Sequence, residues 1–241
     1  MQKDIFKFKK FHIDQTDAGM KIGTDGILLG AWTRPTNEKY ILDIGVGTGL
    51  ITLMMAQLAT EESKIHGVEI DEKSYLLAQK NVAASPWNER IKLFHTPVQD
   101  YLFQSKDRYD LIVSNPPFFS GGVLSESQGR ARVRHTVKLP HGDLLRSVRG
   151  LLTDAGRFTL ILPRIEGLRF IEMADSYGLH CSRKTRVFPH PFRSVERLLL
   201  EFTKDKAVEM DTTDFYIQKD ETPNNYTDEF IDLTREFYLK L

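Results

Sequence analysis

The hydrophobic residues near the start of this 241-residue chain follow a period of two before a helical period takes over. Apolar and polar residues alternate from Phe6 to Ile13, and a short alternation resumes after Asp17-Ala-Gly19. This pattern predicts a short β-hairpin. We interpret Phe6 in it as a core residue. Thr24 then precedes apolar residues at helical spacing that end before Pro35, which predicts a short helix capped by Thr24.

From Tyr40 onward, buried strands alternate with amphipathic helices. Apolar runs predict strands at 40–43, 65–69, 91–95, 109–114 and 157–162, and helical periodicity predicts helices near 50–59, 72–84, 142–152 and 166–177. Runs at 180–188 and 195–203 predict an antiparallel pair after them. Short strand–helix connections are typical of a parallel sheet covered on both faces. The fold class is therefore α/β, with a mostly parallel seven-stranded sheet that contains one antiparallel strand.

These elements predict one domain with an extension at each end. Residues 1–35 hold the hairpin and first helix, residues 36–204 form the core, and residues 205–241 form an acidic segment. Thr227 is expected to start a helix in that last segment. Residues 119–140 show no sustained apolar period, and loops this long are often functional lids or disordered segments.

The formal net charge of zero conceals separate basic and acidic regions. One basic stretch contains Arg130, Arg132, Arg134, Lys138, Arg146 and Arg149, and a second contains Arg183, Lys184, Arg186, Arg193 and Arg197. The balance reverses after Glu201, where acidic residues dominate. A neutral total is therefore compatible with a polyanionic partner, because a local field can steer one.

Composition excludes several classes of protein. No apolar run approaches the roughly 20 residues that cross a bilayer, and the N-terminus lacks the apolar core of a secretory signal. Cys181 is the single cysteine, so the chain forms no internal disulfide and no cysteine-based zinc site. The histidines show no spacing typical of metal ligands. We therefore expect a cytoplasmic protein without a membrane or metal partner, whose oligomeric state the sequence leaves open.

Asn115-Pro-Pro-Phe118 closes the strand expected at 109–114 and carries unusual chemistry. Pro117 has no N–H and holds Pro116 extended, so the Pro116 carbonyl is left as an acceptor. This carbonyl and the Asn115 amide oxygen can accept the two protons of a planar amino group, and Phe118 can stack on its ring. The motif predicts a device that presents an exocyclic or amide nitrogen to an electrophile. The alternative interpretation is a proline loop with Phe118 in the core.

A glycine-rich turn, Asp43-Ile-Gly45-Val-Gly47-Thr-Gly49, follows the first strand of the sheet. Glycines allow a sharp turn and close approach to a ligand beside a helix N-terminus. The dinucleotide fingerprint would need its third glycine at Leu50, so the spacing disfavours a nicotinamide oxidoreductase. Asp43 suits a ligand with a positive amino group.

Two further acids follow the next two strands. Glu69 ends the strand at 65–69, where a carboxylate can bind both ribose hydroxyls, and Asp100 follows the strand at 91–95, where it can bond an adenine amino group. With the turn, these residues predict a site for S-adenosylmethionine, an adenosine with a zwitterionic amino-acid tail.

These motifs resemble the class I, Rossmann-like methyltransferases over nearly all of residues 20–204. Asn115-Pro-Pro-Phe118 resembles the signature of their amino-group branch. With Met20–Trp32 and Arg132–Thr136, it resembles the tRNA1(Val) (adenine(37)-N6)-methyltransferases. This resemblance implies transfer of a methyl group to N6 of the adenosine beside the anticodon, with Thr24 and Asp25 near the methionine end of the cofactor. Phe118 stands where many adenine-specific relatives have Tyr, which leaves the base open.

The expected mechanism is alignment rather than acid–base chemistry. Asn115 lies between cofactor and base, and it and Pro116 accept hydrogen bonds from the amino group. We expect no general base, metal or covalent intermediate. Phe118 and Phe119 contact the base, and the basic loop residues contact RNA phosphates: Arg130, Arg132, Arg134 and Lys138. Alternative acceptors are guanine N2 in ribosomal RNA, adenine in DNA and a glutamine amide. An alternative of another class is a catalytically silent RNA-binding module.

Overall fold

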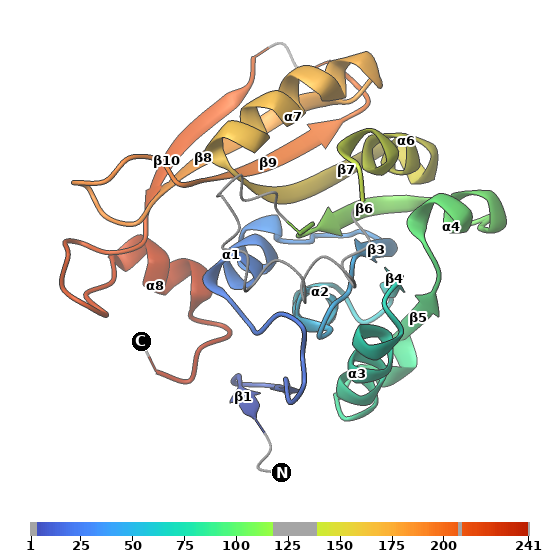
Figure 1. Cartoon of the computed structure of the whole chain (residues 1–241), viewed down its shortest axis with the longest axis horizontal. Helices are drawn as coiled ribbons and strands as arrows, with labels where there is room; N and C mark the ends of the chain where they lie inside the picture. Colours follow the sequence, from blue (N-terminus) through green and yellow to red (C-terminus); the bar gives the residue numbers. More distant parts are fainter. Residues whose placement is uncertain (1–3, 118–138, 207–208, 241) are drawn as a thin grey trace, which may run out of the picture.

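In a computed structural model, residues 4–117, 139–206 and 209–240 of the chain are described, and most of their strands build one large sheet (Figure 1). Its strands are β3 (Tyr40–Ile44), β4 (Lys64–Glu69), β5 (Ile91–His95), β6 (Tyr109–Ser114), β7 (Leu152–Pro163), β8 (His180–Phe188), β9 (Arg197–Thr203) and β10 (Asp211–Tyr216). Their spatial order is β10-β8-β9-β7-β6-β3-β4-β5. Strand β9 is antiparallel to β7 and β8, while the other pairs are parallel. The predicted α/β class and antiparallel strand are confirmed.

The sheet has eight strands among the described residues, one more than the sequence predicts. The additional strand, β10, lies in the acidic segment for which only a helix was predicted. It pairs with β8 at the sheet edge, and its first four residues are exposed. The alternating apolar signal is weak here because the edge strand buries little apolar surface. Asp214 of β10 accepts from Arg186 of β8 at 2.5 and 2.8 Å, so part of the acidic segment neutralises the second basic stretch.

Helices cover both faces of the sheet. They are α1 (Thr24–Thr33), α2 (Leu50–Leu58), α3 (Glu72–Ala83), α4 (Val98–Gln104), α6 (His141–Leu151), α7 (Arg164–Ser176) and α8 (Asp228–Thr234), with a short 3₁₀ turn at Asn88–Arg90. α1, α2 and α8 pack against one face, while α4, α6 and α7 pack against the other (Figure 1). Neighbouring strand residues alternate between these cores: Ile41 belongs to the first and Leu42 to the second. Helices α2, α3, α6 and α7 begin and end within two residues of their predicted bounds.

Two predictions about helices were wrong or incomplete. Thr24 is the first residue of α1 rather than its cap; Gly23 precedes the helix, and no side chain caps it. Helix α4 was not predicted because its few residues carry too little periodicity to distinguish it from a loop. The predicted start of α8 is confirmed, since Thr227 accepts a hydrogen bond from Phe230 N at 3.1 Å.

An N-terminal hairpin is present, but its turn lies at residues 8–11 rather than at 17–19, so the predicted position of the turn was wrong. β1 (Ile5–Lys7) pairs antiparallel with β2 (His12–Asp14), and residues 20–22 lie in no strand. Phe8 and Phe11 follow β1 and stack with ring centroids 4.6 Å apart in the core beside α1 and α2. Phe6 packs partly buried against that core, as predicted. Lys9 N donates to Phe237 O at 2.9 Å, so the hairpin also contacts the chain after α8. Both ends of the chain therefore stabilise the face that carries α1.

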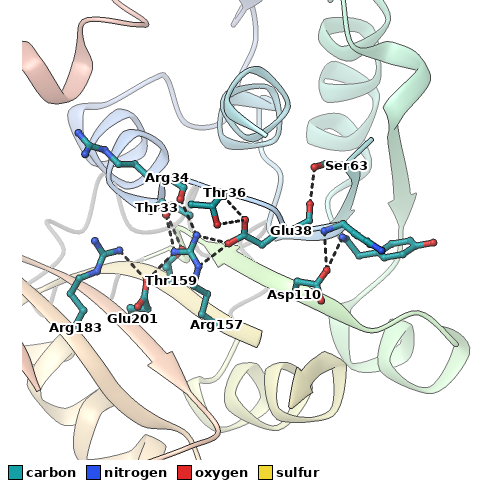
Figure 2. A network of polar contacts seen from close by, with 12 residues as sticks. Thr33, Arg34, Thr36, Glu38, Ser63, Asp110, Arg157, Thr159, Arg183 and Glu201 are labelled. Atoms are coloured by element: carbon teal, nitrogen blue, oxygen red, sulfur yellow. Dashed lines mark hydrogen bonds and ion pairs between the residues drawn. The ribbon is translucent and has the colours of Figure 1, made fainter. Parts of the chain in front are cut away.

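A network centred on Arg157 closes the amino-terminal edge of the sheet (Figure 2). Arg157 pairs with Glu38 at 2.7 Å and Glu201 at 2.9 Å, and donates to the Thr33 carbonyl at 2.8 Å. Arg183 pairs with Glu201 at 3.0 Å and lies 3.7 Å from the centroid of Trp32. Partly buried charges with several partners contribute mainly by fixing geometry. This network joins the end of α1 to β7, β8 and β9, and leaves the carboxyl-terminal edge for a ligand site.

Candidate active site

The glycine-rich turn lies at the carboxyl end of β3, where the sequence predicts it. Gly45, Gly47 and Gly49 have φ angles of 81°, 58° and 87°, in the left-handed region that glycine adopts without strain. Gly45 N donates to Val68 O of β4 at 2.9 Å, and Gly49 N donates to Val46 O at 2.9 Å. Backbone hydrogen bonds within the turn and to β4 therefore help to fix it, and Gly49 precedes α2.

Asp43 lies beneath this turn and is only 1% exposed. Thr52 Oγ1 of α2 donates to Asp43 Oδ2 at 2.6 Å. Asp43 Oδ1 accepts no hydrogen bond from the described residues. Burial raises the pKa of Asp43 to about 7, and the charge of Glu69 also raises it. The carboxylate is thus an acceptor with unused capacity at the bottom of the turn.

Glu69 ends β4 beside the turn and is 8% exposed. Its Oε2 accepts from Gly47 N at 2.9 Å, and its Oε1 accepts from Asp71 N at 2.9 Å. Asp71 in turn caps α3 by accepting from Ser74 N at 2.8 Å. The carboxylate therefore joins the glycine turn to the start of α3, and each of its oxygens keeps a further lone pair.

Asn115 follows β6, the strand next to β3. Ile44 and Ser114 are register partners, and Ser114 Oγ donates to the Ile44 carbonyl at 2.8 Å, so Asn115 lies at the same edge as the turn. Its amide oxygen is buried and accepts no hydrogen bond from the described residues. Pro116 is buried and Pro117 is exposed. A buried amide oxygen without a donor costs free energy, so this acceptor is a candidate for a ligand's N–H.

The start of α1 lies against Asn115. A Cβ at Gly26 would lie 3.0 Å from Leu50 Cδ2 and 3.9 Å from Asn115 Nδ2. Thr24 is exposed, while Asp25 is half-buried and accepts from Arg197 Nε of β9 at 2.9 Å. Sequence reasoning missed Gly26, although a glycine within a helix is a signal of close approach because it costs helical stability.

Asn81 of α3 is a second residue that sequence reasoning missed. Its amide nitrogen donates to the Thr48 carbonyl at 2.9 Å and to the Asp14 carbonyl at 3.0 Å, and its amide oxygen accepts from Asp14 N at 2.9 Å. Asn81 is 2% exposed and therefore ties the glycine turn to the N-terminal hairpin. No local pattern signals this role, because all its partners lie more than 30 residues away.

The remaining predicted site residues either lie farther along the chain from this turn or fall outside the described residues. Asp100 lies in the first turn of α4, after β5, and is exposed. Phe118, Phe119, Arg130, Arg132, Arg134 and Lys138 lie outside the described residues, as does most of the loop predicted at 119–140. Cys181 lies on β8, where burial raises the pKa of its thiol to about 11. The thiol therefore stays protonated at neutral pH.

A hollow of about 350 Å³ at the other edge of the sheet does not belong to this site. It is lined by Glu38, Asp110 and Arg157 among others. Their charged groups already bond protein partners in the network of Figure 2. Residues 4–117, 139–206 and 209–240 contain no cluster of three potential metal ligands, and none of their helices is long and apolar enough to span a membrane.

The residues at the carboxyl edge fit a cofactor with an ammonium group and a nucleoside. At the carboxyl ends of neighbouring strands, Asp43 and Asn115 each present a buried oxygen that accepts no hydrogen bond from the described residues, beside a turn with three glycines in the left-handed region. Glu69 adds a carboxylate at the next strand end. Acceptors dominate this set, so it suits donor groups such as amines and ribose hydroxyls rather than a pyrophosphate.

Comparison with known proteins identifies the family of this chain. The family model of the methyltransferase small domain matches residues 13–161. A tRNA1(Val) (adenine(37)-N6)-methyltransferase from Trichodesmium erythraeum is 43% identical over 237 residues, covering 98% of each chain. Its counterpart from Actinobacillus succinogenes is 41% identical over 98% of this chain and 97% of its own. The chain belongs to the tRNA1(Val) (adenine(37)-N6)-methyltransferase family. The family resemblance of its motifs is thereby confirmed.

Solved structures show the same fold at low sequence identity. A predicted O-methyltransferase from Agrobacterium tumefaciens has a TM-score of 0.64 at 15% identity, covering 88% of this chain and 96% of its own. NSun6 from Pyrococcus horikoshii, solved with SFG, has a TM-score of 0.59 at 14% identity over 80% of this chain and 55% of its own. Methyltransferases outside this family therefore share the Rossmann-like fold of this chain.

Proposed function

We propose that this chain is an enzyme that transfers a methyl group from S-adenosylmethionine to N6 of adenosine 37 in tRNA1(Val), in the cytoplasm. One observation carries the proposal: the buried amide oxygen of Asn115, which accepts no hydrogen bond from the part of the chain that the structure describes, lies one strand from the glycine turn. Family membership supplies the substrate class, and the acceptor supplies a reason for an amino nitrogen as the target.

The cofactor would be held along the ends of β3, β4 and β5. The glycine turn leaves room for close approach, and Glu69 would bind the ribose hydroxyls. Asp43 would attract the ammonium tail; because it is 1% exposed, this is an attraction across the turn rather than a direct hydrogen bond. Thr24 and Asp25 would lie near the methionine end, and Asp100 would bond the adenine amino group.

When bound, S-adenosylmethionine supplies an electrophilic methyl group on a sulfonium. The N6 nitrogen is a poor nucleophile because its lone pair is delocalised into the ring. Asn115 Oδ1 and the Pro116 carbonyl would accept hydrogen bonds from its two N–H groups, and these hydrogen bonds strengthen as positive charge develops on the nitrogen. As the carbon–nitrogen bond forms, the carbon–sulfur bond would break, the sulfur would keep the electron pair as a thioether, and one amino proton would pass to solvent. Orientation of this kind can supply roughly 7–11 kcal/mol. The proposed methyl transfer needs neither a general base nor a metal.

The residues that follow Asn115 would hold the RNA. An anticodon loop allows a base to leave the stack at low cost, and Phe118 and Phe119 would stack on it. The basic residues of the same segment would contact phosphates: Arg130, Arg132, Arg134 and Lys138.

Label transfer tests the proposal. The protein is incubated with methyl-labelled S-adenosylmethionine and separate pools of unmodified tRNA, ribosomal RNA, DNA and protein, and labelled nucleosides are identified by mass spectrometry. We expect label only in tRNA, as N6-methyladenosine, and none in a tRNA1(Val) transcript with guanosine at position 37. Label in another pool would show that this pool, rather than tRNA, contains the substrate. Cofactor binding without turnover on unmodified tRNA would support a silent RNA-binding module.

A further inference from the structure

We propose that the loop between β8 and β9, together with the start of α7, forms a second RNA-binding surface beside the active site. We define this β8–β9 surface by Arg164, Phe192 and Arg193. It would contact the nucleotides that flank the target base and so position the RNA over Asn115. This inference rests on the proposed function, since it assigns a surface to the same RNA substrate.

The topology places this surface at the edge that carries the site. Because β7 is parallel to β6 and antiparallel to β9, the end of β7 and the start of β9 lie at the carboxyl-terminal edge (Figure 1). Pro163 is the register partner of Arg197, and Arg164 N donates to the Glu196 carbonyl at 3.1 Å. The start of α7 and the β8–β9 loop are therefore in contact.

A series of contacts joins this surface to Asn115. Arg197, at the start of β9, donates to Asp25 of α1 at 2.9 Å. The next residue, Gly26, lies close to Leu50 and to the amide nitrogen of Asn115. The β8–β9 surface thus lies on the side of Asn115 away from the glycine turn, because β7, β9 and β8 lie on one side of β6 in the sheet, while β3, β4 and β5 lie on the other.

Phe192 projects from a loop whose base is fixed. Its side chain is 77% exposed. The neighbouring His190 is 7% exposed, its ring centroid lies 6.1 Å from that of Phe192, and its carbonyl accepts from Arg193 N at 3.1 Å. Gln218 N donates to the Pro189 carbonyl at 2.9 Å, which ties the loop to the chain after β10. An exposed aromatic ring on a tethered loop is suited to stacking on an unstacked base.

The arginines of the second basic stretch divide into two groups. Arg183, Arg186 and Arg197 pair with carboxylates of Glu201, Asp214 and Asp25. Arg193 and the nearby Arg164 are exposed, and within the described part of the chain neither forms an ion pair with a carboxylate. Glu196 is the acid in the loop itself. Among the described residues, the β8–β9 surface therefore combines an exposed aromatic ring with two arginines that have no carboxylate partner, and this combination favours single-stranded RNA over an apolar protein partner.

The test measures RNA binding and turnover for variants of the full-length protein. Phe192→Ala should raise KM for a tRNA1(Val) transcript at least about fivefold, with kcat and cofactor affinity little changed, and Phe192→Trp should restore KM. The double variant Arg164→Ala and Arg193→Ala should weaken binding and reduce the slope of log K against log salt by about 0.7–0.9 for each lost phosphate contact.

A matched control comes from the opposite edge of the molecule. Phe103 is 83% exposed near the end of α4, and Arg108 is exposed and bonds only nearby carbonyls among the described residues. The variant Phe103→Ala with Arg108→Ala should bind and methylate RNA as the wild type does.

The outcomes separate this inference from the proposed function. An active wild type whose β8–β9 variants match the control variant in KM and salt slope would overturn the inference alone. So would variants that bind RNA normally but lose a protein partner. A wild type that methylates no tRNA would overturn both. Circular dichroism of each variant confirms that a changed KM does not reflect unfolding.

Discussion

Thr52 donates its hydroxyl proton to one oxygen of Asp43 at 2.6 Å, while the other oxygen of that buried carboxylate bonds no described residue. The two side chains meet because α2 turns back over the end of β3 directly after the glycine turn. The fold thus satisfies one oxygen of the carboxylate, and the other adds a buried acceptor beneath the turn without a hydrogen bond from the described residues. This relationship decides how the protein responds to pH.

Cofactor affinity should rise with pH through about 7. Burial raises the pKa of Asp43 to about 7, so its carboxylate is neutral below that pH and attracts the ammonium group only above it. The ammonium group itself loses its proton near about pH 8, which sets the upper limit of the rise. Calorimetric titration with S-adenosylmethionine across this range measures the effect. A flat profile in the wild type would contradict it, and Asp43→Asn should bind weakly at every pH.

The same group should make the free protein less stable as pH rises. Its folded pKa, about 7, lies above the unfolded value of 3.8, so the folded state binds the proton more tightly. This contribution to stability is complete below the unfolded pKa and is lost as pH rises through the folded pKa. Asp43→Asn avoids the buried charge and should therefore melt higher than the wild type by a few degrees at about pH 8, with a smaller difference at about pH 5. Scanning calorimetry without cofactor checks this; a lower melting temperature for the variant at about pH 8 would contradict it.

Asn115→Ala should remove turnover and leave cofactor binding nearly unchanged. The amide oxygen is expected to act on the target nitrogen in the transition state, and loss of one such group costs roughly 10²–10³ in kcat. Single-turnover methylation of tRNA and calorimetry with the cofactor separate the two effects. A rate near that of the wild type would count decisively against the proposed mechanism.

Asn81→Ala should weaken cofactor binding although Asn81 does not belong to the predicted site. The substitution removes the hydrogen bond that fixes the Thr48 carbonyl in the glycine turn and two bonds to Asp14. We expect a cofactor dissociation constant raised about tenfold and a lower melting temperature. Lys80→Ala is the matched control, because it removes a surface ion pair with the same Asp14 and leaves the turn intact. Equal cofactor dissociation constants for the two variants would show that Asn81 does not position the turn.

The combined Arg130→Ala, Arg132→Ala and Arg134→Ala variant should raise the RNA dissociation constant and flatten its salt dependence. Each lost phosphate contact should reduce the slope of log K against log salt by about 0.7–0.9. Filter binding at several salt concentrations measures this slope. An unchanged slope would assign the phosphate contacts to other residues, with the β8–β9 surface as the first candidate.

Local patterns predicted most of the fold. The apolar runs of β3, β4, β5 and β6 and the periodicity of α2, α3, α6 and α7 fixed the element order, since each buries enough apolar surface to leave a signal. The glycine turn, Glu69 and Asn115 were predicted at their strand ends for the same reason. Strand β10 escaped prediction because it is a polar edge strand, and Thr24 was misassigned because the chain caps α1 without a side chain.

The sequence by itself determined the order of the elements and the chemical groups at the carboxyl edge, because both depend on residue type and spacing along the chain. Only the tertiary structure decided which oxygens of Asp43 and Asn115 accept no hydrogen bond from the described residues, that Asn81 holds the turn, and that Asp25 pairs with Arg197. These relationships join residues that are distant in the sequence, and burial, which sets the pKa of Asp43, exists only when the layers of the fold close around it.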